Sequence, residues 1–285
     1  MPDVQHFYHA GSGTLSYVLS DPSTSSAAII DPVLEFSVVS GRTDMSSSQA
    51  LIDFVKQKSL SVEWILETHA HADHLSSAQL LKSALGGKVA IGRGITRVQE
   101  TFGEIFNLKP PFVADGRQFD HLFDDGEAFN IGDLECRVMA TPGHTNDSVT
   151  YIVDDAAFIG DTLFNTDAGS ARCDFPGGDA GLLYDSIQKL LGLPPHTTLY
   201  LCHDYPPESR DVAVGVTVAE QSAKNIHVGK GATREAYVEM RESRDATLPL
   251  PRLIIPSVQV NIRAGALPDA EDNDVSYLKI PLNRL

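Results

Sequence analysis

The chain has 285 residues, of which 42% are hydrophobic and 21% charged, with 22 glycines and 16 prolines. These values are typical of a folded globular protein and exclude a disulfide-stapled miniprotein, a disordered chain and a fibrous or coiled-coil protein. Lys and Arg number 22 against 38 Asp and Glu, so the net charge is −16. Such a surface repels phosphates, and we expect neither a nucleic-acid nor a membrane partner.

Short apolar runs alternate with stretches of helical period, which is the pattern of an α/β protein. The expected strands are, in chain order, residues 7–8, 14–19, 27–30, 62–67, 128–131, 134–140, 150–153, 156–159, 198–202 and 258–262. One helix is expected to be capped by Ser48, with Leu51, Phe54 and Val55 on its buried face. A second is expected over residues 75–85 and to end at Gly86.

Gly132-Asp133 and Asp154-Asp155 each separate two of these strands, which predicts two β-hairpins. A chain that mixes hairpins with strand–helix units does not suit a purely parallel sheet or a β/α barrel. We therefore expect an α/β fold of two mixed β-sheets with helices outside. The polar stretches 37–48 and 264–273 are expected to be surface loops.

The cysteines are three, Cys136, Cys173 and Cys202, and no Cys-x-x-Cys spacing occurs. They fit neither a disulfide framework nor a zinc knuckle. The N-terminus lacks the basic start and apolar run of a signal peptide, and no run reaches the about 18 apolar residues of a membrane span. These features predict a cytoplasmic protein.

Three histidines and an aspartate lie within six positions between an expected strand and an expected helix: His69, His71, Asp73 and His74. In an extended segment His69 and His71 project to the same side, so the segment can present metal ligands. The alternative is a solvated loop that is His-rich by chance. Because only 10 of the 285 residues are histidine, chance clustering is improbable.

Three further polar residues, His144, Asp161 and His203, each follow the end of an expected strand, as His69 does. Alone, each has a structural explanation as a turn, a cap or a hydrogen-bonded histidine. Their repetition favours one site along a sheet edge. Imidazole and carboxylate ligands without thiolate suit zinc, iron or manganese, and Cys202 is expected to be a buried structural thiol.

This ligand series, in its order and spacing, resembles the metallo-β-lactamase superfamily. The resemblance implies an αββα sandwich of two mixed β-sheets with helices outside. It also implies that residues 1–285 form a single domain of this kind, with a family-specific C-terminal segment from about residue 206. Within the superfamily the chain is most similar to the persulfide dioxygenases, also called sulfur dioxygenases or ETHE1-like proteins. This likeness rests on residues 160–164, 169–175, 203–205, 255–256 and 261–265.

The family resemblance implies a non-haem iron oxidoreductase that holds one Fe(II) per chain on His69, His144 and Asp161. The remaining ligand-type residues would tune ligand orientation and proton transfer; they are His71, Asp73, His74 and His203. The implied reaction converts glutathione persulfide, O2 and water to sulfite and glutathione, in sulfur metabolism and sulfide detoxification. A homodimer is included among the expected assemblies.

Substrate binding is expected to need a basic residue near the iron, because glutathione carries two carboxylates. Arg172 and Tyr205 are the first candidates, and Lys224 and His227 are weaker ones. Better-known members of the family carry arginine where His227 stands. This difference makes Arg172 the stronger candidate for the carboxylate contact. The structural alternative is an Arg172 paired with Asp174 or Asp179.

Two other functions remain open at this point. A hydroxyacylglutathione hydrolase resembling glyoxalase II could hold two metals on the same seven residues and activate a hydroxide. A binding module with no metal or one zinc is the third, although the full ligand set argues against it. The tail favours the dioxygenase, because residues 258–262 alternate like a strand where glyoxalase II carries a helical domain.

Overall fold

A computed structural model describes residues 1–284 and confirms the expected α/β fold. The first sheet contains β1 (Asp3–His9), β2 (Thr14–Ser20), β3 (Ser26–Ile30), β6 (Ser61–Leu66), β8 (Lys88–Gly92) and β9 (His121–Phe123). The second contains β10 (Ala128–Ile131), β11 (Leu134–Ala140), β12 (Val149–Val153), β13 (Ala156–Phe158), β14 (Thr198–Tyr200) and β15 (Gly215–Thr217). A small third sheet joins β5 (Arg42–Asp44), β4 (Val33–Ser37) and β7 (Leu75–Ser76).

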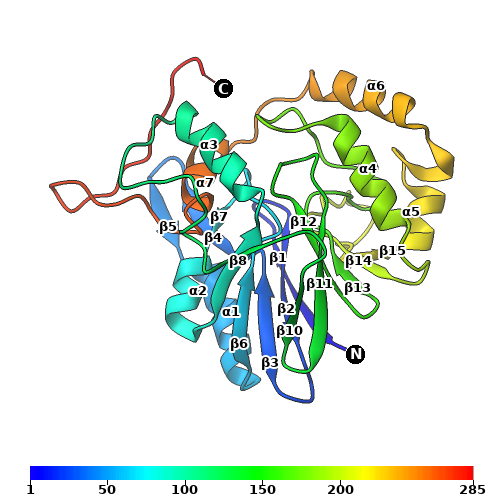
Figure 1. The fold of residues 1–285 in the computed structure, drawn as a ribbon, viewed down its shortest axis with the longest axis horizontal. Coiled ribbons are helices and arrows are strands. Elements are labelled where there is room, and N and C mark those ends of the chain that lie inside the picture. Colours follow the sequence, from blue (N-terminus) through cyan, green and yellow to red (C-terminus); the bar gives the residue numbers. More distant parts are fainter. Residues whose placement is uncertain (285) are drawn as a thin grey trace.

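Helices lie on the outer sides of the two large sheets (Figure 1). Beside the first sheet are α1 (Ser46–Gln57), α2 (Ala78–Leu85) and α3 (Ile95–Ile105); beside the second are α4 (Ala180–Leu191), α5 (Val218–Lys224) and α6 (Arg234–Asp245). A 3-10 turn, Gly229–Gly231, follows α5, and α7 (Ile254–Asn261) contacts β7. The layers are therefore those of an αββα sandwich.

The strands β2 and β3 show why the sheets stack. Leu15, Tyr17 and Leu19 of β2 point into the apolar core between the two sheets, whereas Val18 points to the core beneath the helices. In β3, Ala28 and Ile30 face the first core and Ala27 and Ile29 the second. Because successive side chains of a strand point to opposite faces, strands buried on both faces are mostly apolar, as β2 and β3 are; the buried Ser16 of β2 donates its hydroxyl to the carbonyl of Asp31.

Both large sheets are mixed, as expected. In the first, β1, β2 and β3 are antiparallel, and β6, β8 and β9 continue from β3 in parallel. The second begins with the antiparallel strands β10 to β13, and β13 pairs with β14 in parallel. The two predicted hairpins are the pairs β10–β11 and β12–β13.

The expectation of a strand over residues 258–262 is wrong, because this segment belongs to the buried helix α7 and its end. Alternating Val258, Val260 and Ile262 imitate a strand, but α7 is surrounded by protein and shows no single apolar face. Pro256 is compatible with this helix because it stands in the first turn, where no backbone N–H is needed. Residues 264–273 form a loop, as expected.

Three other expectations need correction near the helix starts. Leu75 lies in β7 and not in the following helix, which begins at Ala78 and is followed by Gly86 as predicted. Ser48 lies inside α1 and does not cap it; its hydroxyl donates to the carbonyl of Val33. Residues 37–48 are only partly a loop, since they include β5 and the start of α1.

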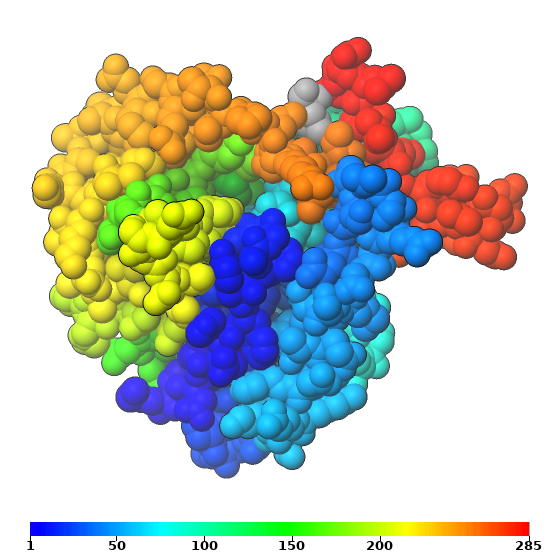
Figure 2. Space-filling model, turned by 180° about the vertical axis from the view of Figure 1, so that it is seen from behind, coloured from blue at the N-terminus to red at the C-terminus, as the bar shows by residue number. Residues whose placement is uncertain are grey.

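Residues far apart in sequence meet around the N-terminal hairpin. Figure 2 shows the segment that follows β14, in yellow, against the β1–β2 turn, in blue. The amide of Asp204 donates to the carbonyl of Gly13, and Thr14 bridges to His203. Within residues 1–284, every helix is too short or too polar to cross a bilayer.

Candidate metal centre

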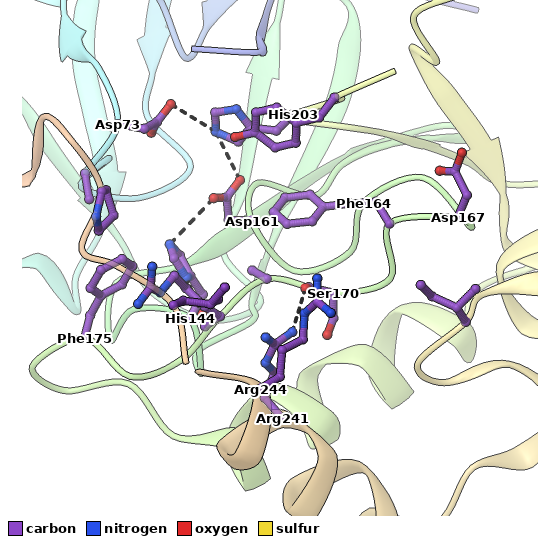
Figure 3. A pocket seen from close by; sticks show the side chains of 18 residues that line it. Asp73, His144, Asp161, Phe164, Asp167, Ser170, Phe175, His203, Arg241 and Arg244 are labelled. Atoms are coloured by element: carbon purple, nitrogen blue, oxygen red, sulfur yellow. Dashed lines mark hydrogen bonds and ion pairs between the residues drawn. The ribbon is translucent and has the colours of Figure 1, made fainter. Parts of the chain in front are cut away.

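The expected ligand residues gather along one edge of the two sheets. His69 follows β6, His144 follows β11, Asp161 follows β13 and His203 follows β14. Asp161 lies at the centre of the group (Figure 3). Its Oδ2 is 3.9 Å from His69 Nε2 and 3.6 Å from His144 Nε2, and its Oδ1 is 3.4 Å from His203 Nε2. The Asp161 carboxylate thus lies close to histidines that follow strands of both large sheets.

Three of these residues form a compact donor set. One ligand atom each from His69, His144 and Asp161 lie within 4.8 Å of one another, and all three side chains are buried. His69 Nε2 and Asp161 Oδ1 are buried atoms with no hydrogen-bond partner in the described chain. Buried polar atoms are normally paired, so these orphaned donors fit a cation that two imidazoles and one carboxylate would hold.

In His69 and His144, the ring nitrogen that does not face Asp161 is Nδ1, and it is held by contacts within the protein. His69 Nδ1 is 3.0 Å from the hydroxyl of Thr68, which donates at 2.9 Å to Asp31. His144 Nδ1 is 2.6 Å from the carbonyl of Arg172 and must donate to it. Both Nε2 atoms are therefore left with free lone pairs. Burial, followed by the nearby His71, lowers the pKa of His69 well below its usual value, which keeps the ring neutral.

His71 faces a different set of partners. Its Nε2 is 3.0 Å from Asp31 Oδ1 and 3.5 Å from Glu67 Oε2. Burial disfavours the charged ring, but the Asp31 carboxylate prevails and raises the pKa of His71 well above its usual value. His71 is not part of the compact set formed by His69, His144 and Asp161.

A second group of donors lies on the other side of Asp161. His74 Nε2 and His203 Nε2 are buried atoms without a hydrogen-bond partner among residues 1–284. His203 Nε2 is 3.6 Å from Asp73 Oδ2, and Thr14 Oγ1 lies 3.3 Å from His74 Nδ1. Burial opposes ionisation of Asp73, but His203 and His74 hold the pKa of its carboxyl well below its usual value.

Asn261, at the end of α7, holds the ligand loop in place. Its Nδ2 donates to the carbonyls of His71 at 2.8 Å and His74 at 2.9 Å, and its Oδ1 accepts from the amide of Ser76 at 2.8 Å. Three buried backbone groups of one loop are thereby satisfied by a single side chain. The C-terminal segment is thus part of the support of the site.

Two glycines permit the close approach of the ligand-bearing turns. Gly160 has φ +52°, and a Cβ there would lie 2.8 Å from Thr68 Oγ1. Gly143 has φ +140°, and a Cβ there would lie 2.3 Å from the backbone of Leu183. Only glycine combines these positive φ angles with such short distances, and each residue directly precedes a ligand, Asp161 or His144.

A cavity of about 400 Å³ opens onto this centre. Its lining includes Asp73, His144, Asp161, His203, Phe164, Phe175, Tyr205, Ser170, Arg172, Arg241 and Arg244. The candidate metal ligands occupy one part, and the rest of the lining includes aromatic, aliphatic and basic side chains. This combination suits a small molecule that brings one atom to the metal and an anionic group to the other end.

The expected substrate residues divide into two groups. Arg172 and Tyr205 line the cavity, whereas Lys224 and His227 do not. Lys224 pairs with Glu220 at 3.0 Å, and His227 Nδ1 accepts from the amide of Ser170 at 2.9 Å. Burial lowers the pKa of His227 to about 4, so this ring is neutral and offers no charge.

Arg172 forms the structural pair that the sequence left open. Its Nε and Nη2 each donate to Asp174 at 2.7 Å, and its Nη1 donates at 2.7 Å to the carbonyl of Pro249. Cys202 is a buried thiol, as expected, and its Sγ donates to Asp31. Burial raises the pKa of this thiol well above its usual value.

Several residues that support the site escaped the sequence analysis: Asp31, Glu67, Thr68, Asn261 and Arg244. Asp31 directly follows β3, so the strand-end pattern that found His144, Asp161 and His203 could have found it as well. Asn261 lies in the stretch 261–265 that contributes to the family resemblance, but nothing in the sequence marks it as a support of the ligand loop, and no comparable signal marks Arg244.

Replacing Thr68 by Val should test the orientation of His69. The change removes the hydroxyl that lies between His69 Nδ1 and Asp31 but keeps the branched shape. Because residues that orient metal ligands contribute about tenfold or more to metal affinity, we expect a loss of that size. Titration of the metal-depleted protein with Fe(II) measures it. Thr96→Val, at an exposed hydroxyl on α3, is the matched control; equal affinities in both variants would contradict the role of Thr68.

Comparison with known proteins agrees with this architecture. Residues 10–203 match the metallo-beta-lactamase superfamily. The chain is 51% identical to a probable metallo-hydrolase of Burkholderia pseudomallei, over 99% of both chains, and 48% identical to Glyoxylase B2 of Dictyostelium discoideum, over 99% of this chain and 97% of that protein. The chain belongs to the metallo-β-lactamase superfamily.

Within this superfamily the chain is also similar to persulfide dioxygenases. Human mitochondrial persulfide dioxygenase ETHE1 is 29% identical over 92% of this chain and 88% of that protein. The crystal structure of ETHE1 from Myxococcus xanthus superposes with a TM-score of 0.73 at 28% identity, covering 93% of this chain and all of that one.

Proposed function

We propose that this protein is an iron-dependent persulfide dioxygenase that oxidises glutathione persulfide. One glutathione persulfide, one O2 and one water give one glutathione, one sulfite and two protons. The observation that carries the proposal is the compact set of His69, His144 and Asp161. His71 is outside this set; its Nε2 contacts Asp31 and Glu67, and it forms a separate set with Asp73 and His74. Two histidines and one carboxylate on one face leave coordination positions for two reactants.

Iron bound to these three side chains would supply the redox chemistry that joins dioxygen to the terminal sulfur of the persulfide. The chain's own residues position the reactants. Thr68 and the Arg172 carbonyl fix the rings of His69 and His144. Phe164 and Phe175 line the cavity with apolar surface, which limits water around the sulfur. His203, between Asp73 and Asp161, is placed to hold a proton released during the reaction.

The comparisons support the proposal at the level of a family resemblance. The similarity to human persulfide dioxygenase ETHE1 and to ETHE1 of Myxococcus xanthus extends over more than nine-tenths of this chain. It includes the C-terminal segment beyond residue 203, where the superfamily match ends.

A second candidate is a hydrolase that resembles glyoxalase II. His74 Nε2 and His203 Nε2 are unpartnered in the described chain and lie beside Asp73 and Asp161, so a second metal could bind there. The names of the relatives at 51% and 48% identity, metallo-hydrolase and Glyoxylase, also favour this candidate. A hydroxide held between two metals would then attack a thioester.

The number of metals separates the two candidates. Elemental analysis of protein produced in medium with both iron and zinc is expected to give one iron per chain, held by the set of His69, His144 and Asp161, of which His144 and Asp161 line the cavity. Two tightly bound metals per chain would favour the hydrolase. Metal content after dialysis against a weak chelator distinguishes bound metal from adventitious metal.

A further inference from the structure

The charged side chains that line the cavity away from the metal ligands are nearly all neutralised by partners within the chain. Asp167 accepts from Arg210 Nε at 2.7 Å, and Arg172 is paired with Asp174. Arg241, which is buried, donates through Nε to Asp245 at 2.9 Å and through Nη1 to the carbonyl of Ser170. None of these groups has a full charge to offer a ligand.

Arg244 differs from them. It stands one turn after Arg241 on α6, its side chain lines the same cavity, and it is exposed. Among residues 1–284 its guanidinium has neither a hydrogen-bond nor an ion-pair partner. Figure 3 shows Arg244 together with Arg241 on the side of the cavity away from Asp73 and His203. An unpaired guanidinium here is the local positive centre that an anionic ligand needs in a chain of net charge −16.

We propose that Arg244 is the specificity residue that binds the glycyl carboxylate of the glutathione moiety. This inference rests on the proposed function and names the substrate contact that the function requires. Of the two carboxylates of glutathione, the γ-glutamyl one stands beside an ammonium group, whereas the glycyl one carries an unbalanced charge. A single unpaired guanidinium matches the second.

The role that the sequence analysis gave to Arg172 thus passes to Arg244. The hydrogen bonds of Arg172 to Asp174 and Pro249 would have to break before it could bind a substrate, and Asp174 would repel a carboxylate. Arg244 can form a bidentate contact without losing an existing one. The apolar residues of the cavity lining, including Phe164 and Phe175, can accommodate the uncharged middle of the peptide.

Binding of glutathione itself tests this contact without relying on turnover. Isothermal titration calorimetry of the metal-loaded protein is done with glutathione and with its glycyl monoethyl ester, which lacks the charge in question. Because the ester removes the charge that the guanidinium binds, wild-type protein should bind the acid about tenfold more tightly than the ester. Arg244→Gln should lose this preference by weakening only the acid, and Arg244→Lys should recover part of it.

Arg137→Gln is the matched control, because Arg137 is an exposed residue of β11 that lies outside the cavity lining. It should bind both ligands as the wild type does. Wild-type protein that does not prefer the acid, an Arg244→Gln variant that keeps the preference, or one that loses both ligands equally would each overturn the proposal. If the preference behaves as expected but no sulfite is formed, the carboxylate contact stands and the proposed reaction fails.

Discussion

Asp161→Ala is expected to lose its iron and at least about 99% of its persulfide oxidation activity, because a ligand and the only carboxylate of the triad disappear together. Asp161 also lies within 4 Å of His69, His144 and His203, so its loss removes a contact of all three histidines. The iron content, measured by elemental analysis, and the rate of sulfite formation should fall in parallel. Circular dichroism should show a folded protein.

The matched control is Asp155→Ala, an exposed aspartate that pairs with His196 on the surface. It should retain iron and activity. An Asp161→Ala protein that keeps one iron per chain would contradict the ligand assignment, whatever its activity.

Asn261→Ala is expected to destabilise the protein and to weaken its metal site, although Asn261 does not face the metal. The substitution leaves the carbonyls of His71 and His74 and the amide of Ser76 without their buried partner. Because an unsatisfied buried group costs about 1–3 kcal/mol, the free energy of unfolding should fall by about 3 kcal/mol or more. Fe(II) affinity should fall about tenfold, since the loop that carries the ligands loses its support.

Denaturant unfolding and Fe(II) titration measure these two effects. Asn273→Ala removes an exposed amide that donates to Tyr277 and should change neither quantity by a measurable amount. Asn261→Asp retains the size of the side chain but sets a carboxylate against two carbonyls, so it should not rescue the protein. Wild-type stability in either Asn261 variant would show that α7 does not hold the loop.

The sequence could predict the strands and the gathering of the candidate ligands at one place because both rest on local patterns. Buried strands such as β2, β3 and β6 are short apolar runs bounded by turns. The ligands follow strand ends, and strands of one sheet present their ends at a common edge. Gathering His144, Asp161 and His203 therefore needed no knowledge of the loops between them.

The C-terminal segment could not be predicted in the same way. The alternation of Val258, Val260 and Ile262 indicated a strand. In the fold this segment is buried on all sides, and it forms the helix α7 and its end. The ion pairs decided the role of the arginines: Arg172 is occupied by Asp174 and Arg244 is not. Both outcomes depend on which neighbours the fold supplies, and sequence spacing does not contain that information.

The most direct test of the proposed function is the amount of oxygen consumed per sulfite formed when the purified iron protein is given glutathione persulfide. An oxygen electrode combined with sulfite determination should give one O2 per sulfite, with neither uptake nor sulfite from Asp161→Ala. In parallel, S-lactoylglutathione in the absence of oxygen should remain intact. Rapid anaerobic hydrolysis of this thioester, together with no oxygen uptake on the persulfide, would contradict the dioxygenase and leave the hydrolase as the function of this site.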